Sequence, residues 1–320
     1  MERENITTVR EFIIVGFTGT LKTRIILFIT FLFIYIVICM GNVIIITVIR
    51  SDIRLHTPMY LFISNLSFVE FWYTTSTIPK ILADLLSERG TISFIGCIVQ
   101  LYFVLSLGGV ETFLLTAMSY DRYVAICNPL RYAILMSKGV CLQLIIGCWF
   151  SGFICILTPT ILISRLPFCS SNIINHFFCD VSPLVQLSCS DTRQLQKFNM
   201  ITAIVMVVGT FFLIAVSYGH IVSTILKINS SVGRKKAFST CASHLMVVIL
   251  YYGTVIFMYV RPQAESSLDV DKVTAVFYCV VTPMLNPIIY SLRNKEVKNA
   301  LKKLITRTKI TMGHPSQIVH

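Results

Sequence analysis

The chain has few charged residues for its length. Only 13% of its 320 residues are Asp, Glu, Lys or Arg, whereas 55% are hydrophobic, and the mean hydropathy is +0.77. A soluble globular domain carries roughly 25% charged residues and covers its surface with them. So few charges cannot cover a chain this apolar, which excludes a disordered chain and a water-soluble enzyme of ordinary composition. We expect most of the chain to lie in lipid.

Other patterns are also absent. The sequence has no succession of ~10-residue alternating segments, which argues against a transmembrane β-barrel. It has no internal repeat of the kind that builds two-halved transporters, and its six histidines show no metal-ligand spacing on one helix face. The first four residues are a poor basic start for a signal peptide, and the apolar run from Ile25 is too long for one, so this run is interpreted as a permanent span.

Apolar stretches predict seven membrane spans. Five uncharged runs reach the ~20 residues that a helix needs to cross the hydrocarbon layer, and two more are interrupted only by Glu70 and Glu111. Lipid offers the backbone no hydrogen-bond partner, so the spans should be helices. The predicted fold is an all-α membrane protein, a seven-transmembrane helix bundle with a short amphipathic C-terminal helix. The predicted spans are about 25–49, 58–80, 97–123, 140–162, 198–226, 237–260 and 273–292.

The C-terminal helix is predicted from residues 294–306. Its apolar residues recur at helical spacing and its lysines fall between them, so it should lie along the inner membrane surface. The apolar positions are Val297, Ala300, Leu301, Leu304 and Ile305. The predicted organisation is therefore an extracellular segment 1–24, a bundle 25–292, and a cytoplasmic helix and tail 293–320.

Basic residues predict the orientation. With the N-terminus outside, more than half of the 27 Lys and Arg residues fall in inner loops and the tail, as the positive-inside rule requires. The net charge of +12 then indicates an inner surface that faces anionic lipid or an acidic partner, and not nucleic acid. Asn5 begins an Asn-Ile-Thr glycosylation sequon, which is usable only if that end is extracellular.

The eleven cysteines divide into two groups. Four of them fall in predicted outer segments, where an oxidising compartment favours disulfides. These are Cys97, Cys169, Cys179 and Cys189. Four cysteines allow three pairings, and spacing alone does not choose among them. The other seven lie in spans or at inner ends and should be reduced thiols.

Two motifs lie at the predicted inner ends of spans. In MSYDRYVAIC (118–127), Asp121 can hold Arg122 while the inner face is closed, and the arginine can reach a partner when it opens; the alternative is a pair that only snorkels to the membrane edge. In PMLNPIIYSLRNKEV (283–297), Pro287 removes one backbone hydrogen bond and allows a bend.

Together with three further strings, these motifs resemble those of olfactory receptors, a family of rhodopsin-like G-protein-coupled receptors. The strings are PMYLFISNLSFVE (58–70), SYGHIV (217–222) and KAFSTCASHL (236–245). The resemblance covers nearly all of residues 10–305. It implies an odorant receptor and not an enzyme, located in the plasma membrane of olfactory neuron cilia. It also implies a stimulatory olfactory G protein that raises cyclic AMP, and disulfides Cys97–Cys179 and Cys169–Cys189.

The resemblance also implies two sets of site residues. The ligand pocket would lie between spans three, five, six and seven, at Val104, Leu105, Gly108, Gly109, Thr202, Met206, Tyr252, Val255, Ile256 and Tyr259. The G-protein coupling and activation switch would comprise Asp121, Arg122, Tyr123, Tyr218, His244, Asn286, Pro287 and Tyr290. The pocket set carries no charge, so a small, neutral, mostly apolar ligand is expected. Gly108 and Gly109 either open a cavity or allow close helix packing, and the sequence favours neither.

Glu70 and Glu111 need a reason to lie in the membrane, because an intramembrane carboxylate is costly and usually functional. Two like charges in one site cannot both stay ionised without a counter-ion or a shared proton. We expect the two acids to face each other and to hold a sodium ion or a proton; no other cofactor is expected. The alternative is that each acid is protonated and bonded to a neighbour such as Asn42 or Ser67. A transporter or channel and an intramembrane enzyme are the rival functions.

Overall fold

The computed structural model describes residues 9–17, 19–169, 171–259, 272, 274–292 and 295–313. The predicted glycosylation site at Asn5, residue 260 of the sixth predicted span and residue 273 of the last one lie outside these ranges, as do the side chains of Tyr259 and Ile305.

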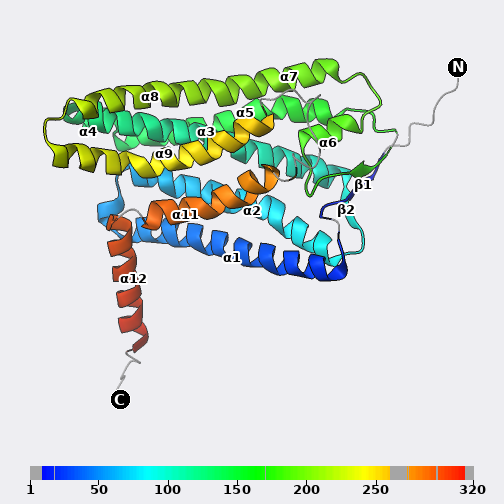
Figure 1. Cartoon of the computed structure of the whole chain (residues 1–320), viewed down its shortest axis with the longest axis horizontal. Helices are drawn as coiled ribbons and strands as arrows, with labels where there is room; N and C mark the ends of the chain where they lie inside the picture. The colour runs from blue at the N-terminus through cyan, green and yellow to red at the C-terminus, as the bar shows by residue number, and fades with distance from the viewer. Residues whose placement is uncertain are drawn as a thin grey trace.

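Long helices lie side by side along the long axis of the molecule (Figure 1). They are α1 (Leu21–Ser51), α2 (Pro58–Leu86), α3 (Phe94–Cys127), α5 (Lys138–Ser164) and α9 (Ser231–Tyr259), with two composite helices. The first composite helix joins α7 (Arg193–Ala203), the π-helical turn η3 (Ile204–Val208) and α8 (Gly209–Leu226). The second joins the π-helical turn η5 (Phe277–Val281) to α11 (Thr282–Leu292). The predicted helix bundle is therefore confirmed.

Within the described residues, five helices are long and apolar enough to cross a membrane. They are Leu21–Ser51, Phe94–Cys127, Lys138–Ser164, Arg193–Leu226 and Ser231–Phe257. Thr274–Tyr290 is a shorter apolar helix. Large side chains such as Phe33, Phe150 and Phe212 are more than half exposed on the outside of the bundle. Contact with lipid explains that exposure, since water would penalise so much apolar surface.

Several helices are longer than the spans predicted from apolar runs. α9 begins at Ser231 instead of 237, and α2 continues to Leu86 instead of 80. The apolar run marks only the part of a helix that lies in hydrocarbon, whereas backbone hydrogen bonding continues where the side chains become polar. Short helical segments complete the inner and outer loops: η1 (Ile53–Leu55), η2 (Pro129–Arg131), α4 (Tyr132–Leu135) and α6 (Val181–Gln186).

A three-stranded sheet covers part of the outer end, which the all-α prediction did not include. β1 (Glu11–Ile14) lies in its middle, antiparallel to β2 (Gly90–Ser93) and parallel to β3 (Ile173–Ile174). Alternate residues of β1 are buried, and the Phe12 ring packs edge-on against Phe168 at 5.3 Å between centroids. β1 satisfies its backbone hydrogen bonds by joining the loop before α3 to the loop after α5.

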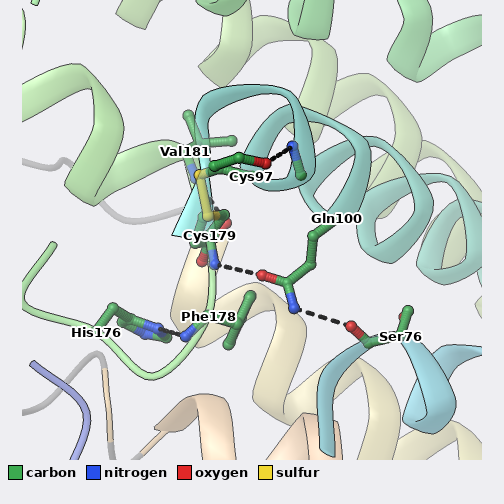
Figure 2. The surroundings of a disulfide bond; sticks show 10 residues. Ser76, Cys97, Gln100, His176, Phe178, Cys179 and Val181 are labelled. Atoms are coloured by element: carbon green, nitrogen blue, oxygen red, sulfur yellow. Dashed lines mark hydrogen bonds between the residues drawn. A yellow bond between two sulfur atoms is a disulfide. The ribbon is translucent and has the colours of Figure 1, made fainter. Parts of the chain in front are cut away.

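Both disulfides implied by the family resemblance are present. Cys97–Cys179 joins the start of α3 to the outer loop, and Cys169–Cys189 closes that loop on itself, with Cα–Cα distances of 5.5 and 5.9 Å. Beside the first bridge, Gln100 Oε1 accepts from the Cys179 N–H at 3.0 Å, and Gln100 Nε2 donates to the Ser76 carbonyl at 2.9 Å (Figure 2). The outer loop, α2 and α3 are thus joined. The seven other cysteines are free, as predicted.

The helix α12 (Lys295–Gly313) runs across the bundle axis and not along it (Figure 1). Val297 and Ala300 are buried against the bundle, whereas Lys298 and Lys302 are exposed. The hydroxyl of Tyr60 on α2 donates to Glu296 at 2.7 Å. The predicted amphipathic C-terminal helix is confirmed, and it extends beyond the expected 306.

Candidate ligand pocket and activation switch

The predicted pocket residues come from α3, from α7 with η3, and from α9, in the outer half of the bundle. Val104, Met206, Tyr252 and Val255 are buried, and four others are partly buried: Leu105, Gly108, Thr202 and Ile256. Val104, Val255 and Ile256 belong to one apolar cluster that also contains Tyr251 and Tyr252. Leu105 packs instead with the outer cluster around Phe12 and Cys97. Gly108 lies beside Tyr251 and Gly109 beside Met206, whereas Leu105 packs toward the outer loop.

The two adjacent glycines of α3 have different surroundings. A Cβ on Gly109 would lie 3.2 Å from Met206 Cε and 3.3 Å from Gly152 Cα, so Gly109 allows α3 and α5 to approach closely. A Cβ on Gly108 would meet only the Tyr251 hydroxyl, at 3.9 Å. Close packing explains Gly109, and Gly108 leaves room beside a hydroxyl.

Tyr251 was not among the predicted pocket residues, yet it lies at the centre of this polar corner. Its hydroxyl donates to the Gly108 carbonyl at 2.7 Å and lies 2.7 Å from the Thr112 hydroxyl. The next residue, Tyr252, donates to the Thr210 hydroxyl at 2.9 Å. A pair of tyrosines in an apolar span could have suggested this arrangement, because their hydroxyls need partners inside the protein.

Below this corner lies a buried polar cluster that contains both membrane carboxylates. Asn286 Nδ2 donates to Glu70 Oε1, the Asn42 side chain also lies within hydrogen-bonding range of Glu70, and Glu111 acts on Glu70 through its charge. Five buried oxygens of the cluster have no hydrogen-bond partner in the described part of the chain. They are Asn42 Oδ1, Glu70 Oε2, Glu111 Oε1, Asn286 Oδ1 and the Tyr290 hydroxyl. The two acids therefore lie in one region, and Asn286 and Asn42, the latter named in the alternative prediction, lie beside Glu70.

Tyr290 lies on the last span, near both the polar cluster and the inner switch. Glu70, Glu111, Tyr218 and Arg122 are all close enough to act on it electrostatically. It lies one turn beyond Asn286 on α11, so both side chains are on the same face of that helix. Pro287, between them, packs against α1, where a Cβ on Gly41 would lie 3.0 Å from the proline Cβ.

At the inner end, Asp121 is completely buried and uses both carboxylate oxygens. Arg122 Nε donates to Oδ2 at 2.9 Å, and the Tyr132 hydroxyl of α4 donates to Oδ1 at 2.7 Å. The Arg122 side chain is only 12% exposed, so it does not snorkel to water. Burial and then the adjacent Asp121 carboxylate raise the pKa of Tyr132, which keeps its hydroxyl a donor. Tyr132 was not predicted, because it comes from the loop after α3.

His244 joins three helices. Its Nε2 lies 3.1 Å from the Leu115 carbonyl, which can only accept, so Nε2 carries the proton. Nδ1 then accepts from the Tyr218 hydroxyl at 2.7 Å. α3, α8 and α9 are thereby held together next to Arg122. Tyr123 points elsewhere, and its ring faces His220 on α8 at 5.7 Å.

Comparison with known proteins decides the family. Residues 31–308 match the family model described as "Olfactory receptor". The chain is 50% identical over 307 residues to olfactory receptor 11L1 of Homo sapiens, covering 96% of this chain and 95% of the relative. It is 50% identical to olfactory receptor 8U9 of Mus musculus (95% and 97%) and 48% identical to olfactory receptor 287 of Rattus norvegicus (94% and 97%).

The chain belongs to the olfactory receptor family. It is therefore a multi-pass membrane receptor of the G-protein-coupled class and not an enzyme, as its sequence motifs predicted. Membership of the family supports odorant reception as its function.

The outer loop of this olfactory receptor contains a buried histidine that the prediction omitted. His176 Nδ1 accepts from the Phe178 N–H at 3.4 Å, which places the proton of the neutral ring on Nε2, and Nε2 has no partner among the described residues (Figure 2). The rings of Phe177 and Phe178 lie 4.6 Å away. Burial, followed by the nearby Lys272 ammonium, lowers the pKa of His176 to about 3.

We expect the stability of the receptor to fall as the pH is lowered from 7 to 5. The folded pKa of His176 lies below the unfolded value of about 6.5, so its contribution is complete above pH 6.5 and is lost as the pH falls toward 3. At pH 5 the contribution of His176 to the free energy of unfolding should be lower by about 2 kcal/mol. Thermal unfolding of purified receptor across this pH range measures it. His176→Gln should reduce the pH dependence by about this amount, whereas the exposed-residue control His56→Gln should leave it unchanged; equal slopes in all three proteins contradict the assignment.

Proposed function

We propose that this olfactory receptor binds a small, neutral, mostly apolar odorant between α3, η3, α9 and the last span. Binding shifts the bundle to an active state that engages a stimulatory olfactory G protein and raises cyclic AMP. The observation that supports the proposal is a series of buried hydrogen-bonded pairs from the pocket to the inner end: Tyr251–Thr112, Asn286–Glu70 and Tyr218–His244.

The first step of this path leads from the pocket to the carboxylates. Tyr251 and Tyr252 both have Glu111 as an electrostatic neighbour, and Tyr251 also contacts Gly108, where the pocket has room. A ligand beside Gly108 that displaces the Tyr251 hydroxyl would change the surroundings of Glu111. Ligands shift an equilibrium only by their difference in affinity for the two states, and this contact supplies such a difference.

The second step leads from the carboxylates to the inner switch. Glu111 neighbours Glu70, Glu70 accepts from Asn286, and Tyr290 lies between this pair and Arg122. In the arrangement described here Arg122 is held by Asp121, and His244 fastens α3 to α8 and α9. We assign this arrangement to the resting state, in which Arg122 is withheld from a partner.

The ligand chemistry follows from the walls of the pocket. The described pocket residues provide aliphatic and aromatic surface with a few hydroxyls, from Thr202, Tyr251 and Tyr252, and no charged side chain. Such a site favours a mostly apolar molecule with one hydrogen-bonding group. An amine ligand or a covalently held retinal is disfavoured, because Val104 and Val280 occupy the positions where those receptors carry an aspartate and a lysine.

We also propose that the N-terminus is extracellular and that the receptor acts in the plasma membrane of olfactory cilia. The two disulfides lie at the end of the bundle that carries β1, and disulfides persist in an oxidising compartment. The opposite end carries α12 with its exposed lysines, which suits an anionic cytoplasmic leaflet.

For the carboxylate pair we propose a sodium ion in the resting state. The residues fit a hard cation, because five buried oxygens without partners in the described ranges gather around two acids. Asn42, Glu70, Glu111, Asn286 and Tyr290 would hold it. A bound cation supplies the counter-charge that two adjacent carboxylates need, whereas one shared proton would satisfy at most two of these oxygens. The described residues contain no group of three or more His, Cys, Asp and Glu side chains that could hold a metal ion, so the proposed site relies on two acids together with amide and phenol oxygens.

One assay tests the proposed function. Cells that express the chain with a stimulatory olfactory G protein should raise cyclic AMP when a mixed odorant panel is applied. Arg122→Ala should abolish the response at unchanged surface expression, because Arg122 is the group withheld from the partner. A response that persists in Arg122→Ala, or a ligand-driven current in cells that lack G proteins, contradicts the proposal.

Basal activity tests the His244 contact. His244→Phe keeps an aromatic ring but loses both hydrogen bonds, which should weaken the resting state by about 1–2 kcal/mol, a five- to thirtyfold shift. Basal cyclic AMP per surface receptor should therefore rise. The control His220→Phe changes an exposed histidine on α8 and should leave it unchanged. Unaltered basal signalling in His244→Phe would remove the contact from the switch.

Sodium dependence tests the cation. The purified receptor without odorant should unfold at a higher temperature in sodium chloride than in choline chloride, by about 1.6 kcal/mol when sodium is roughly fifteen times its dissociation constant. Glu111→Gln should abolish this difference in unfolding temperature. The control Glu88→Gln, in the loop between α2 and β2, should retain it. A shared proton would instead give stability that depends on pH and is indifferent to sodium.

A further inference from the structure

A groove opens on the lipid-facing side of the bundle, between α1, α2 and α5. Its volume is about 250 Å³, and it is separate from the pocket and from the carboxylate cluster. It is lined by Ile46, Arg50, Ser64, Asn65, Phe68 and Trp149. All six side chains are partly or fully exposed, so whatever fills the groove comes from the membrane side.

Among the described residues, the polar side chains of the groove have few partners. Arg50, in the last turn of α1, forms no ion pair with any described residue. The Ser64 hydroxyl likewise forms no hydrogen bond in the described ranges, and Asn65 uses only its amide nitrogen, which donates to the Leu61 carbonyl at 2.9 Å. A cation, a hydroxyl and an amide oxygen therefore face lipid, where an unsatisfied polar group is costly.

These residues are ordered by depth. Arg50 lies in the last turn of α1, at the inner end of the bundle. At 1.5 Å per residue, Asn65 lies about 10 Å along α2 from its inner end and Phe68 about 15 Å. Trp149 lies about 16 Å along α5, near the middle of a ~30 Å hydrocarbon layer. The Phe68 and Trp149 rings meet there at 5.9 Å between centroids.

We propose that this groove binds one anionic phospholipid of the inner leaflet. Its phosphate and acidic headgroup lie on Arg50, its glycerol ester oxygens meet Ser64 and Asn65, and one acyl chain lies against Phe68 and Trp149. The order of cation, hydrogen-bonding groups and aromatic rings with depth follows the order of groups along such a lipid. Charge complementarity selects an anionic headgroup, because no described carboxylate neutralises Arg50.

The two tryptophans of the chain make the site measurable. Trp149 lines the groove, whereas Trp72 lies one turn beyond Phe68 on α2, outside the groove lining, and is 48% exposed to lipid. Full-length receptor carrying Trp72→Phe is reconstituted in symmetric nanodiscs with dibrominated phosphatidylserine or dibrominated phosphatidylcholine. Bromines quench tryptophan on contact, so the loss of Trp149 fluorescence reports the lipid in the groove. Symmetric bilayers make the result independent of receptor orientation and of odorant binding.

We expect phosphatidylserine to be preferred about fivefold at Trp149, which corresponds to about 1 kcal/mol for one basic residue. Arg50→Gln should abolish the preference. Arg54→Gln is the matched control, since Arg54 also lies at this inner end but pairs with Asp52 outside the groove, and it should keep the preference. A receptor with Trp149→Phe that retains Trp72 reports only the lipid around Trp72, and its quenching should show no preference for phosphatidylserine.

Three results overturn the proposal. They are equal quenching of Trp149 by both lipids, a preference that survives Arg50→Gln, and selective quenching by a brominated sterol, which would assign the groove to a sterol. If Arg50→Gln does not fold, Asn65→Leu decides: it should lower quenching by phosphatidylserine, and unchanged quenching also overturns the proposal.

Discussion

Polar groups inside the bundle must be satisfied by the protein, because hydrocarbon offers them no hydrogen-bond partner. Glu70 and Glu111 need the most partners. Asn286 donates to one oxygen of Glu70, whereas Glu70 Oε2 and Glu111 Oε1 have no hydrogen-bond partner among the described residues. Leaving a buried acceptor unpaired costs about 1–3 kcal/mol, so a cluster with several such atoms is sensitive to small changes around it. Along α3, Gly108 of the proposed pocket comes before Glu111 and the Asp121–Arg122 pair comes after it, so the cluster lies between the two proposed sites.

The two ends of the bundle are held together by different kinds of bond. At the outer end, two disulfides, a three-stranded sheet and the Gln100 bridge connect the loops to α2 and α3. At the inner end, the described contacts between helices are hydrogen bonds such as Tyr218–His244 and Tyr132–Asp121. Bonds that each contribute about 1 kcal/mol can exchange within a two-state equilibrium, whereas disulfides cannot. The opening that we propose toward a G protein therefore falls at the inner end.

The helices could be predicted from the sequence because a bilayer imposes one length and one kind of backbone bonding on every span. The Asp121–Arg122 pair and the Asn286–Pro287 turn could be predicted because each lies in a recognisable string. Tyr132 and Tyr251 could not, since one reaches Asp121 from a different element and the other acts through the backbone of α3. Whether Gly108 and Gly109 opened space or allowed packing depended on Gly152 of another helix, which no local pattern contains.

α2 shows why composition alone describes a membrane receptor incompletely. It is absent from the five helices that meet the length and hydropathy criterion in the described chain, although it has 29 residues and packs along α1 and α3. Its inward face carries Glu70, Thr74 and Thr77, all buried, and its outward face carries Ser64 and Asn65 in the lipid-facing groove. Polar residues on both faces lower the mean hydropathy of the helix. The same residues place α2 between the polar core and the membrane, so its low hydropathy reflects the contacts that it makes on each side.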